Sequence, residues 1–398
     1  AQQLQTFDNP YDGTQTLVGV ASLSGNVTDL GRFLDGGELG AALDFREQVL
    51  DPARNQLGLV AMGISATFNE QHQLGVDLNG QPGGDFFLPL DATFTAHPSN
   101  TGASSISVSV SDAAALTKHD YSLRYGSGQW TLTNLATNVS QSGAGPFVVD
   151  GVTINVAGAP DDGDSFLIQP TRQGATLFDV VLNQPQDFAG ASPLRSQAIL
   201  SNTGSSSIDG LSVNDASALP LGSQVTLTFN PDALGVGVPG FDVVGIVGGP
   251  LAYDPATESN GKDFSLGGFD FTLSGDPQAG DELIIENNLN GTGDNRNALA
   301  LAGLQTSSVL NGGTASYQDA YGRLVADVAV KTRQAEAGAS TEQVLLNQSI
   351  AARDSVSGVN LDEEAANLIR YQQAYQAAAQ VISVADQMFQ VLLNATQR

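Results

Sequence analysis

The sequence contains no cysteine, which excludes disulfide bonds, thiolate metal ligands and cysteine nucleophiles. Positive charge is also scarce. Only 15 Lys and Arg stand against 42 Asp and Glu, and the net charge of −27 opposes binding to nucleic-acid phosphates or anionic membranes. No apolar run approaches the roughly 18 residues that a membrane-spanning helix needs; the richest run covers only residues 298–304. We therefore expect neither nucleic acid nor a membrane among the partners.

Catalytic and cofactor motifs are scarce as well. The three histidines, His72, His97 and His119, stand far apart without zinc-binding spacing, and we expect them on surfaces or helix faces. Residues 235–240 (GVGVPG) match the letters of a dinucleotide fingerprint, but they follow a strand pattern and contain Pro239, so a loop is expected. These observations predict no cofactor and no metal.

Acidic residues are numerous, yet none marks a catalytic pair. Asp161, Asp162 and Asp164 are hard oxygen ligands that calcium could use, but turn acids are the simpler interpretation. A paired-carboxylate hydrolase remains open, although the single Trp130 argues against an aromatic platform for sugars. We predict that the chain is not an enzyme.

The first 75 residues show helical periodicity after an irregular lead. Apolar residues recur at spacings of three and four. They are Leu39, Leu43, Leu50, Leu57, Ala61, Ile64 and Phe68. Asp51 followed by Pro52 is typical of an N-cap and the first helical position, which predicts two helices or one kinked helix.

Residues 76–297 change to the period of two that antiparallel strands show. The clearest alternating runs are residues 106–110 (ISVSV), 225–229 (VTLTF) and 269–273 (FDFTL). Clusters of Gly, Asn, Asp and Pro separate the runs, as tight turns require. This region carries six Lys and Arg against 24 Asp and Glu, so much of the negative surface lies here.

The same region repeats itself. Residues recur at an offset of about 117, and an upstream block recurs at about 103, so the second copy gains some 14 residues near Pro231 to Pro250. The first set pairs Phe147, Gly151, Gly158, Pro160, Gly163 and Asp164 with Phe264, Gly268, Gly275, Pro277, Gly280 and Asp281. We infer two tandem β domains, 76–186 and 187–297, the second an internal repeat of the first.

Helical periodicity returns after residue 297. A long helix is expected over 298–358, with Gly358 as its stop, and Asn360 is expected to cap a C-terminal helix within 359–398. That helix has an apolar stripe at heptad spacing, as in a coiled coil. The residues that we expect to form a polymer interface are Leu361, Leu368, Tyr371, Tyr375, Ile382, Phe389 and Leu392. Packing of this stripe inside the same chain, against residues 38–75 or 316–356, is the alternative.

The fold class predicted from these patterns is multidomain α+β. Long α-helices from both chain ends form a helical bundle or coiled coil, and two tandem antiparallel β domains lie between them. In this plan residues 1–75 are the N-terminal helical part of the bundle domain, residues 298–358 return to it, and residues 359–398 form an axial-core helix.

The C-terminal segment resembles the signature of bacterial flagellar axial proteins. The resemblance covers residues 359–368 (VNLDEEAANL) and continues through residues 371–377 (YQQAYQA) to Ile382. Residues 43–57 and 293–299 are similar to the hook-associated protein 1 family in particular, as are residues 312–321. The resemblance is strong over 31–80 and 290–398, and weaker across the β region.

The resemblance implies a structural role at the junction between the flagellar hook and filament. It implies assembly as a ring, with other copies, the hook protein and neighbouring hook-associated or filament proteins as partners, and an export chaperone acting on the C-terminal helix. It further implies an extracellular location reached without a cleaved secretory signal. Family members pair an N-terminal helical segment with the C-terminal helix, and from the resemblance we expect this sequence to lack that segment.

Three other functions stay open at this stage. The chain could be the hook protein or another axial protein, although the segment from Asp51 to Gln56 argues against the hook protein. It could also be an adhesin-like extracellular protein whose tandem β domains bind a host or glycan ligand, although such a protein does not require helices at both ends. A hydrolase fused to an axial scaffold is a third class.

Overall fold

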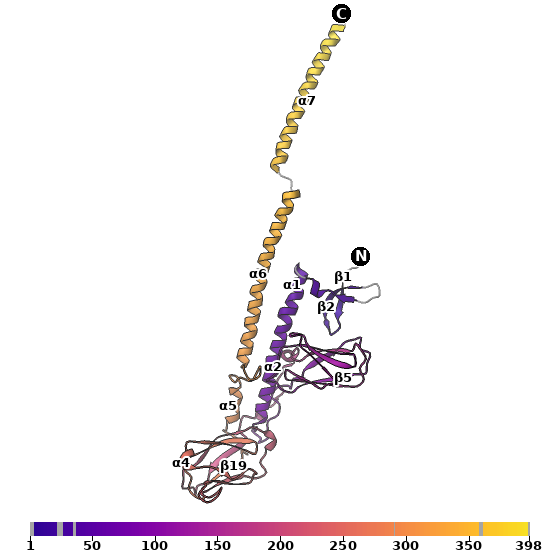
Figure 1. Cartoon of the computed structure of the whole chain (residues 1–398). Helices are drawn as coiled ribbons and strands as arrows, with labels where there is room; N and C mark the ends of the chain where they lie inside the picture. Colours follow the sequence, from indigo (N-terminus) through magenta and orange to yellow (C-terminus); the bar gives the residue numbers. More distant parts are fainter. Residues whose placement is uncertain (1–3, 22–26, 35–36, 290, 358–360, 397–398) are drawn as a thin grey trace. The chain divides into compact units, whose positions relative to one another are not determined.

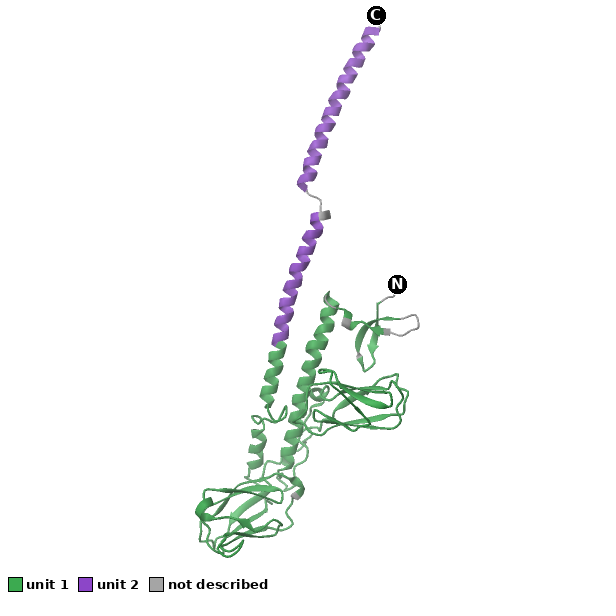
Figure 2. Cartoon of the chain, viewed as in Figure 1, with its two compact units in different colours: residues 1–328 green, residues 329–398 purple. Residues whose placement is uncertain are grey.

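The computed structural model describes residues 4–21, 27–34, 37–289, 291–357 and 361–396. The chain divides into two compact units, residues 1–328 and residues 329–398 (Figure 2). The first unit contains the β domains and the helices that carry them (Figure 1). Helix α6 (Tyr317–Ser357) crosses the boundary, and α7 (Leu361–Thr396) belongs to the second unit. The predicted fold class, multidomain α+β with antiparallel sheets between helical regions, is confirmed.

The N-terminal region differs from the expected irregular lead, because it forms a three-stranded antiparallel sheet. Its strands are β1 (Leu4–Asn9), β2 (Asp12–Ala21) and β3 (Val27–Asp29), in the order β1-β2-β3. The sheet contacts the first β domain, where the Tyr11 hydroxyl lies 3.1 Å from Ser165 Oγ and the Tyr11 ring meets the His97 ring edge-on. A single-turn 3-10 helix (Gly31–Phe33) follows β3.

The helical region that follows is continuous rather than capped at Asp51. Helix α1 (Gly37–Phe45) runs through a π-helical segment (Arg46–Leu50) into α2 (Asp51–Gln73). Pro52 has no N–H to donate to the carbonyl four residues earlier, and the wider π turns directly precede it. Asp51 itself has helical dihedral angles, φ −66° and ψ −46°, so the N-cap prediction is wrong. Its carboxylate pairs with Arg172 instead.

The two β domains have matching strand orders. In the first, the sheets are β4-β11-β6-β7-β8 and β5-β10-β9; in the second, they are β12-β19-β14-β15-β16 and β13-β18-β17. The first set comprises β4 (Thr93–Ala96), β5 (Ser105–Val110), β6 (Tyr121–Gly126), β7 (Gln129–Asn134), β8 (Ser140–Gly143), β9 (Phe147–Val149), β10 (Val152–Ala157) and β11 (Ser165–Gln169). The second comprises β12 (Leu194–Ala198), β13 (Ser207–Val213), β14 (Val225–Asn230), β15 (Gly240–Val244), β16 (Leu251–Ala252), β17 (Lys262–Leu266), β18 (Phe269–Ser274) and β19 (Glu282–Asn287). Each strand therefore has one counterpart in the other domain.

Short helices occupy the connections. They are α3 (Gly174–Leu177), two single-turn 3-10 helices (Pro185–Asp187 and Ala216–Ala218), α4 (Pro255–Glu258) and α5 (Arg296–Gly303). The extra residues of the second β domain lie in the loop between β14 and β15 and in the longer connections on either side of β16. Residues 235–239 belong to the first of these loops, as expected from Pro239.

Each β domain has its own core. Alternate residues of both sheets face inward, as in the β14 residues Val225, Leu227 and Phe229, while the residues between them are only partly buried. The core of the first domain extends into α2 through Leu59 and Met62, whereas the second domain forms a separate cluster. The first β domain is thus packed directly onto α2.

One buried aspartate organises the same turn in both domains. Asp164 Oδ1 accepts the backbone N–H groups of Thr101 and Gly102 at 3.0 and 3.3 Å, and Oδ2 accepts that of Asp161 at 3.1 Å. In the second domain Asp281 accepts the N–H groups of Thr203, Gly204 and Gln278 at 2.8 to 2.9 Å. Asp164 and Asp281 therefore act as acceptors within their turns.

The two buried aspartates are expected to make the stability of the β domains depend on pH. Burial opposes ionisation of Asp164 and Asp281, but the backbone donors outweigh it and hold the pKa of each carboxyl below its ordinary value. Because the pKa is lower in the folded state, the stabilisation is complete above the unfolded-state pKa of about 3.9 and is lost as pH falls through the folded pKa. We expect Asp164→Asn and Asp281→Asn to lower Tm at pH 7 and to flatten its fall below about pH 4.

Thermal unfolding between pH 2.5 and pH 7 measures this effect. Asp162→Asn, an exposed change in the turn that holds Asp164, is the matched control and should leave the profile of Tm against pH unchanged. A profile for Asp164→Asn that parallels the wild type at every pH would contradict the proposed role of the carboxylate.

Candidate assembly interface

Helix α7 presents the predicted apolar stripe on its surface. With 36 residues, α7 is about 54 Å long, and none of its described residues is buried. The side chains of the stripe are between 63% and 80% exposed. They are Leu361, Leu368, Tyr371, Tyr375, Ile382, Phe389 and Leu392. The spacing of the residues places all seven along one face of the helix.

A second apolar stripe, which the heptad analysis missed, lies beside the first. Val381, Val384, Met388 and Val391 are 51% to 68% exposed and alternate at spacings of three and four. At about 100° per residue, the centre of this stripe lies roughly 140° around the helix from the centre of the first. The signal was present in the sequence, since residues 377, 384 and 391 repeat every seven positions. The C-terminal half of α7 therefore has an apolar surface wide enough for two neighbouring helices.

The first turn of α7 is acidic. Asp362, Glu363 and Glu364 lie where the partial positive charge of the helix N-terminus favours them. The residues on which we placed the preceding helix stop and the cap, Gly358 and Asn360, lie outside the described residues. The single long helix expected over 298–358 is two helices in the structure, α5 and α6, because the turns over residues 304–316 separate them and α6 begins only at Tyr317. Beyond residue 328 it also exposes apolar side chains, among them Val344 and Leu345.

In the first unit, a partly buried ion-pair cluster fixes the first β domain to α2. The Arg172 guanidinium pairs with the Asp51 carboxylate, and its other nitrogen lies 3.0 Å from Asp120 Oδ2. The Asn55 amide of α2 also donates to Asp120, at 2.9 Å. A carboxylate and an amide of α2 therefore hold two segments of this β domain, since Asp120 precedes β6 and Arg172 follows β11.

A second network joins α2 to the start of α5. His72 is fully buried rather than exposed on the helix face; its Nδ1 lies 2.8 Å from the Gly84 carbonyl and its Nε2 accepts the Ala189 N–H at 2.9 Å. The Asn297 amide donates to the Ala189 carbonyl at 2.6 Å and accepts from Gln71 at 2.7 Å. This network holds the segment that follows the second β domain against α2. It therefore gives residues 293–299 a structural role.

Comparison with known proteins matches three segments of the chain to models of flagellar proteins. Residues 1–87 match the flagellar hook-associated protein FlgK helical domain, and residues 95–170 match the D2-like domain of flagellar hook-associated protein 1. Residues 353–395, which include the exposed stripe, match the C-terminal model of the flagellar basal body rod FlgEFG proteins.

Whole-chain comparisons agree. Flagellar hook-associated protein 1 of Escherichia coli is 29% identical over 99% of this chain, and that of Salmonella typhimurium is 28% identical over 99%. The structure of the flagellar hook junction protein FlgK from Burkholderia pseudomallei superposes with a TM-score of 0.79 at 29% identity, covering 90% of this chain and 71% of that one. The chain is thus similar to flagellar hook-associated protein 1 over nearly its whole length. It spans 56% of the length of the Escherichia coli and Salmonella relatives.

The recognition made from residues 43–57, 293–299 and the C-terminal signature is thereby confirmed. Within the described part of the chain, no helix combines the length and apolar character that crossing a membrane demands. The same residues hold no group of three or more His, Asp or Glu side chains arranged to bind a metal ion.

Proposed function

We propose that this chain is a structural adaptor of the bacterial flagellum, assembling as a ring at the junction between hook and filament. Similarity to hook-associated protein 1 supports this role. The observation that carries the assembly mechanism is the exposed apolar stripe of α7. The role that we propose is mechanical and needs no catalytic residues.

Burial of the stripe would supply the free energy of assembly. Each large apolar side chain contributes about 1.5 to 3 kcal/mol when it leaves water, so seven contribute on the order of 10 kcal/mol before entropy is subtracted. A lone helix in water is marginally stable, and a partner helix removes both the exposed area and the fraying. The second stripe would contact a further helix. Contacts of this kind join two different surfaces and propagate around a ring.

The proposed partners follow from this mechanism. The first are other copies of the same chain, and the next are the hook protein and the neighbouring hook-associated or filament proteins. An export chaperone would cover the α7 stripe before assembly. The site of action would be extracellular, at the hook–filament junction, reached by export without a cleaved secretory signal. Absence of cysteine suits passage of an unfolded chain, since a crosslink would obstruct a narrow channel.

Localisation in cells tests the proposal. The full protein containing this chain, carrying an epitope in the exposed β7–β8 turn near Asn138, is expressed in a flagellated strain without its own hook-associated protein 1. We expect immunogold labelling in a narrow band between hook and filament, together with restored filament attachment. Label along the hook, label along the filament or label on the cell surface would each contradict a junction role.

A further inference from the structure

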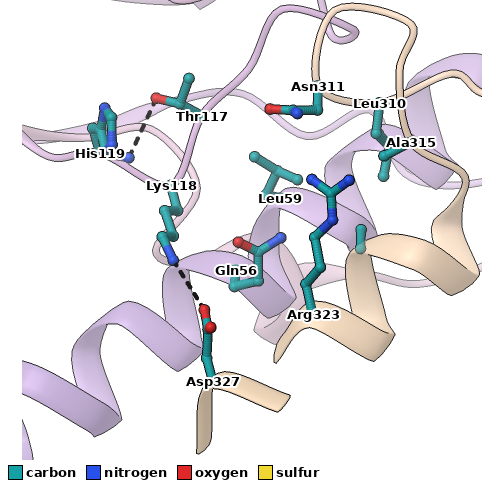
Figure 3. A pocket seen from close by; sticks show the side chains of 11 residues that line it. Gln56, Leu59, Thr117, Lys118, His119, Leu310, Asn311, Ala315, Arg323 and Asp327 are labelled. Carbon is teal, nitrogen blue, oxygen red and sulfur yellow. Dashed lines mark hydrogen bonds and ion pairs between the residues drawn. The ribbon is translucent and has the colours of Figure 1, made fainter. Parts of the chain in front are cut away.

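Four segments of the first unit enclose a pocket of about 250 Å³ (Figure 3). No residue of the α7 stripe lines it. The segments are α2, residues 117–119 after β5, the turn at 310–315 and the first turns of α6. Its floor is apolar and buried, formed by Leu59, Leu310, Ala315 and Ala320. Its rim is polar and carries Lys118, His119, Arg323 and Asp327. We name it the Arg323 pocket.

Two cations of the rim differ in their contacts. Lys118 forms an ion pair, whereas Arg323 forms neither an ion pair within 4 Å nor a hydrogen bond in the described part of the chain. Lys118 Nζ lies 3.5 Å from Asp327 Oδ2, a half-exposed pair of the kind that contributes little energy (Figure 3). In the described part of the chain, no hydrogen bond and no ion pair within 4 Å reaches the Arg323 guanidinium. Asp319, one helical turn earlier, is near enough for the charge of Arg323 to act on it, but its carboxylate accepts hydrogen bonds from the hydroxyl and backbone N–H of Ser316 at 2.8 and 3.1 Å. The guanidinium therefore retains its capacity for a bidentate carboxylate.

The wall beside Arg323 is held in place before any ligand arrives. Asn311 adopts a left-handed φ of 56°, and the Gly312 N–H donates to the Ala114 carbonyl at 2.6 Å. Leu310 and Ala315 pair across the turn through backbone hydrogen bonds of 2.9 and 3.1 Å. A preformed wall lowers the entropy cost of binding.

We propose that the Arg323 pocket receives an acidic side chain from a second copy of this chain. The inference rests on the proposed assembly of the chain into a ring. Copies that each carry a net charge of −27 repel one another, and that repulsion falls where a contact sets an acid of one copy against a cation of the next. With 42 acids against 15 bases, an approaching copy presents acids far more often than bases.

The shape of the site favours glutamate or aspartate over a free inorganic anion. The guanidinium takes the carboxylate, while the floor formed by Leu59 and Ala320 takes the methylene groups of the stem. A free phosphate would leave this apolar floor uncovered. The contact joins two different surfaces, a pocket and an acidic projection, as a ring of identical subunits requires.

Two measurements test this inference on the full chain. In the first, Arg323→Glu is compared with Arg124→Glu, the same charge change at an exposed arginine on β6. We expect Arg323→Glu to reduce assembly at hook ends about tenfold or more, and Arg124→Glu to have much less effect. Arg323→Gln, which keeps most of the stem, should assemble weakly and with less dependence on salt than the wild type, because its contact lacks the screened ion pair.

In the second measurement, a photo-crosslinking amino acid replaces Asn311 on the pocket rim. Crosslinked peptides are identified by mass spectrometry after assembly. Crosslinks to an acidic segment of a second copy support the inference. Crosslinks to a different protein, no crosslinks from assembled rings, or equal assembly of Arg323→Glu and Arg124→Glu would each overturn it while leaving the junction role intact. If the wild-type chain does not assemble, the proposed function fails and this inference fails with it.

Discussion

Ile382→Asp is expected to abolish assembly of the chain at hook ends while the β domains stay folded. Ile382 lies in the middle of the α7 stripe and is 68% exposed in the chain by itself, so the substitution has little to disturb before assembly. In the proposed assembly the same position faces a neighbouring helix. The variant then loses about 1.5 to 3 kcal/mol of apolar burial and brings an ionised carboxylate into an apolar contact, at a cost of several kcal/mol more.

The combined effect exceeds about 4 kcal/mol at each contact, which corresponds to a roughly thousandfold weaker association. Because every copy of a ring makes the same contact, the loss recurs around the whole assembly. Electron microscopy of hook ends, together with sedimentation of assembled material, measures the outcome. Circular dichroism and the unfolding midpoint of the β domains show whether the fold is retained.

Gln380→Asp is the matched control for this experiment. It introduces the same carboxylate two residues earlier on the same exposed helix, about 160° away around the helix axis from Ile382. Assembly of Gln380→Asp near the wild-type level, with Ile382→Asp lost, assigns the effect to the stripe. Loss of both variants would point to a general effect of charge on α7, and normal assembly of Ile382→Asp would remove the stripe from the mechanism.

Local patterns predicted much of the fold. The alternating runs at 225–229 and 269–273 form strands β14 and β18, because one face of each run must be buried. The recurring glycines mark shared turns: Gly158 and Gly275 have φ of 85° and 88°, and an added Cβ would meet a backbone carbonyl in both places. Only glycine fits such positions, so the repeat can be recognised in the sequence.

The N-terminal sheet was missed for a physical reason. Strand β2 reads Thr16-Leu17-Val18-Gly19-Val20, which is rich in β-branched residues, but the glycine and the adjacent leucine and valine break a clean alternation. The turn dipeptides Asn9-Pro10, before β2, and Asp12-Gly13, at its start, were the signal that could have located the hairpin.

Long-range contacts were beyond any local pattern. The Arg172 pair with Asp51 joins residues 121 positions apart, and nothing in either segment specifies the other. The same holds for the Arg323 pocket, whose walls come from four separate segments. By contrast, the α7 stripe lies within one helix, so its residues were identified before the structure was known. Sequence periodicity predicts which residues share one face of a helix. It does not predict which distant segments form a pocket or an ion pair, because the tertiary fold determines those contacts.

Gly58→Ala is expected to destabilise the first unit strongly, because α2 meets the first β domain there at backbone contact. A Cβ built on Gly58 would lie 1.7 Å from the Thr171 carbonyl oxygen, and one built on Gly174 would lie 2.6 Å from the Gly58 carbonyl oxygen. The contact is with backbone, so no rotation of a side chain relieves it. The two segments must separate by more than an ångström, which strains the neighbouring Arg172 pairs and opens the packing around Met62.

The expected loss is about 3 to 5 kcal/mol in the free energy of unfolding, at the upper end of what single substitutions cause. Urea unfolding followed by the fluorescence of Trp130, which is buried in the core of the first β domain, measures it. In the helix itself alanine is the better residue by about 0.8 to 1.0 kcal/mol, so the sign of the result depends on the tertiary contact alone.

Gly322→Ala isolates that contact. Gly322 lies in α6, and a Cβ built on it meets nothing within 4 Å. The same substitution there should raise the unfolding free energy by up to about 1 kcal/mol through helix propensity. A lower free energy of unfolding for Gly58→Ala and a higher one for Gly322→Ala would establish that backbone contact between α2 and α3 holds the β domain on α2. An unfolding midpoint for Gly58→Ala at or above the wild-type value would mean that the two segments can separate freely. The close backbone contact would then not be what holds the β domain on α2.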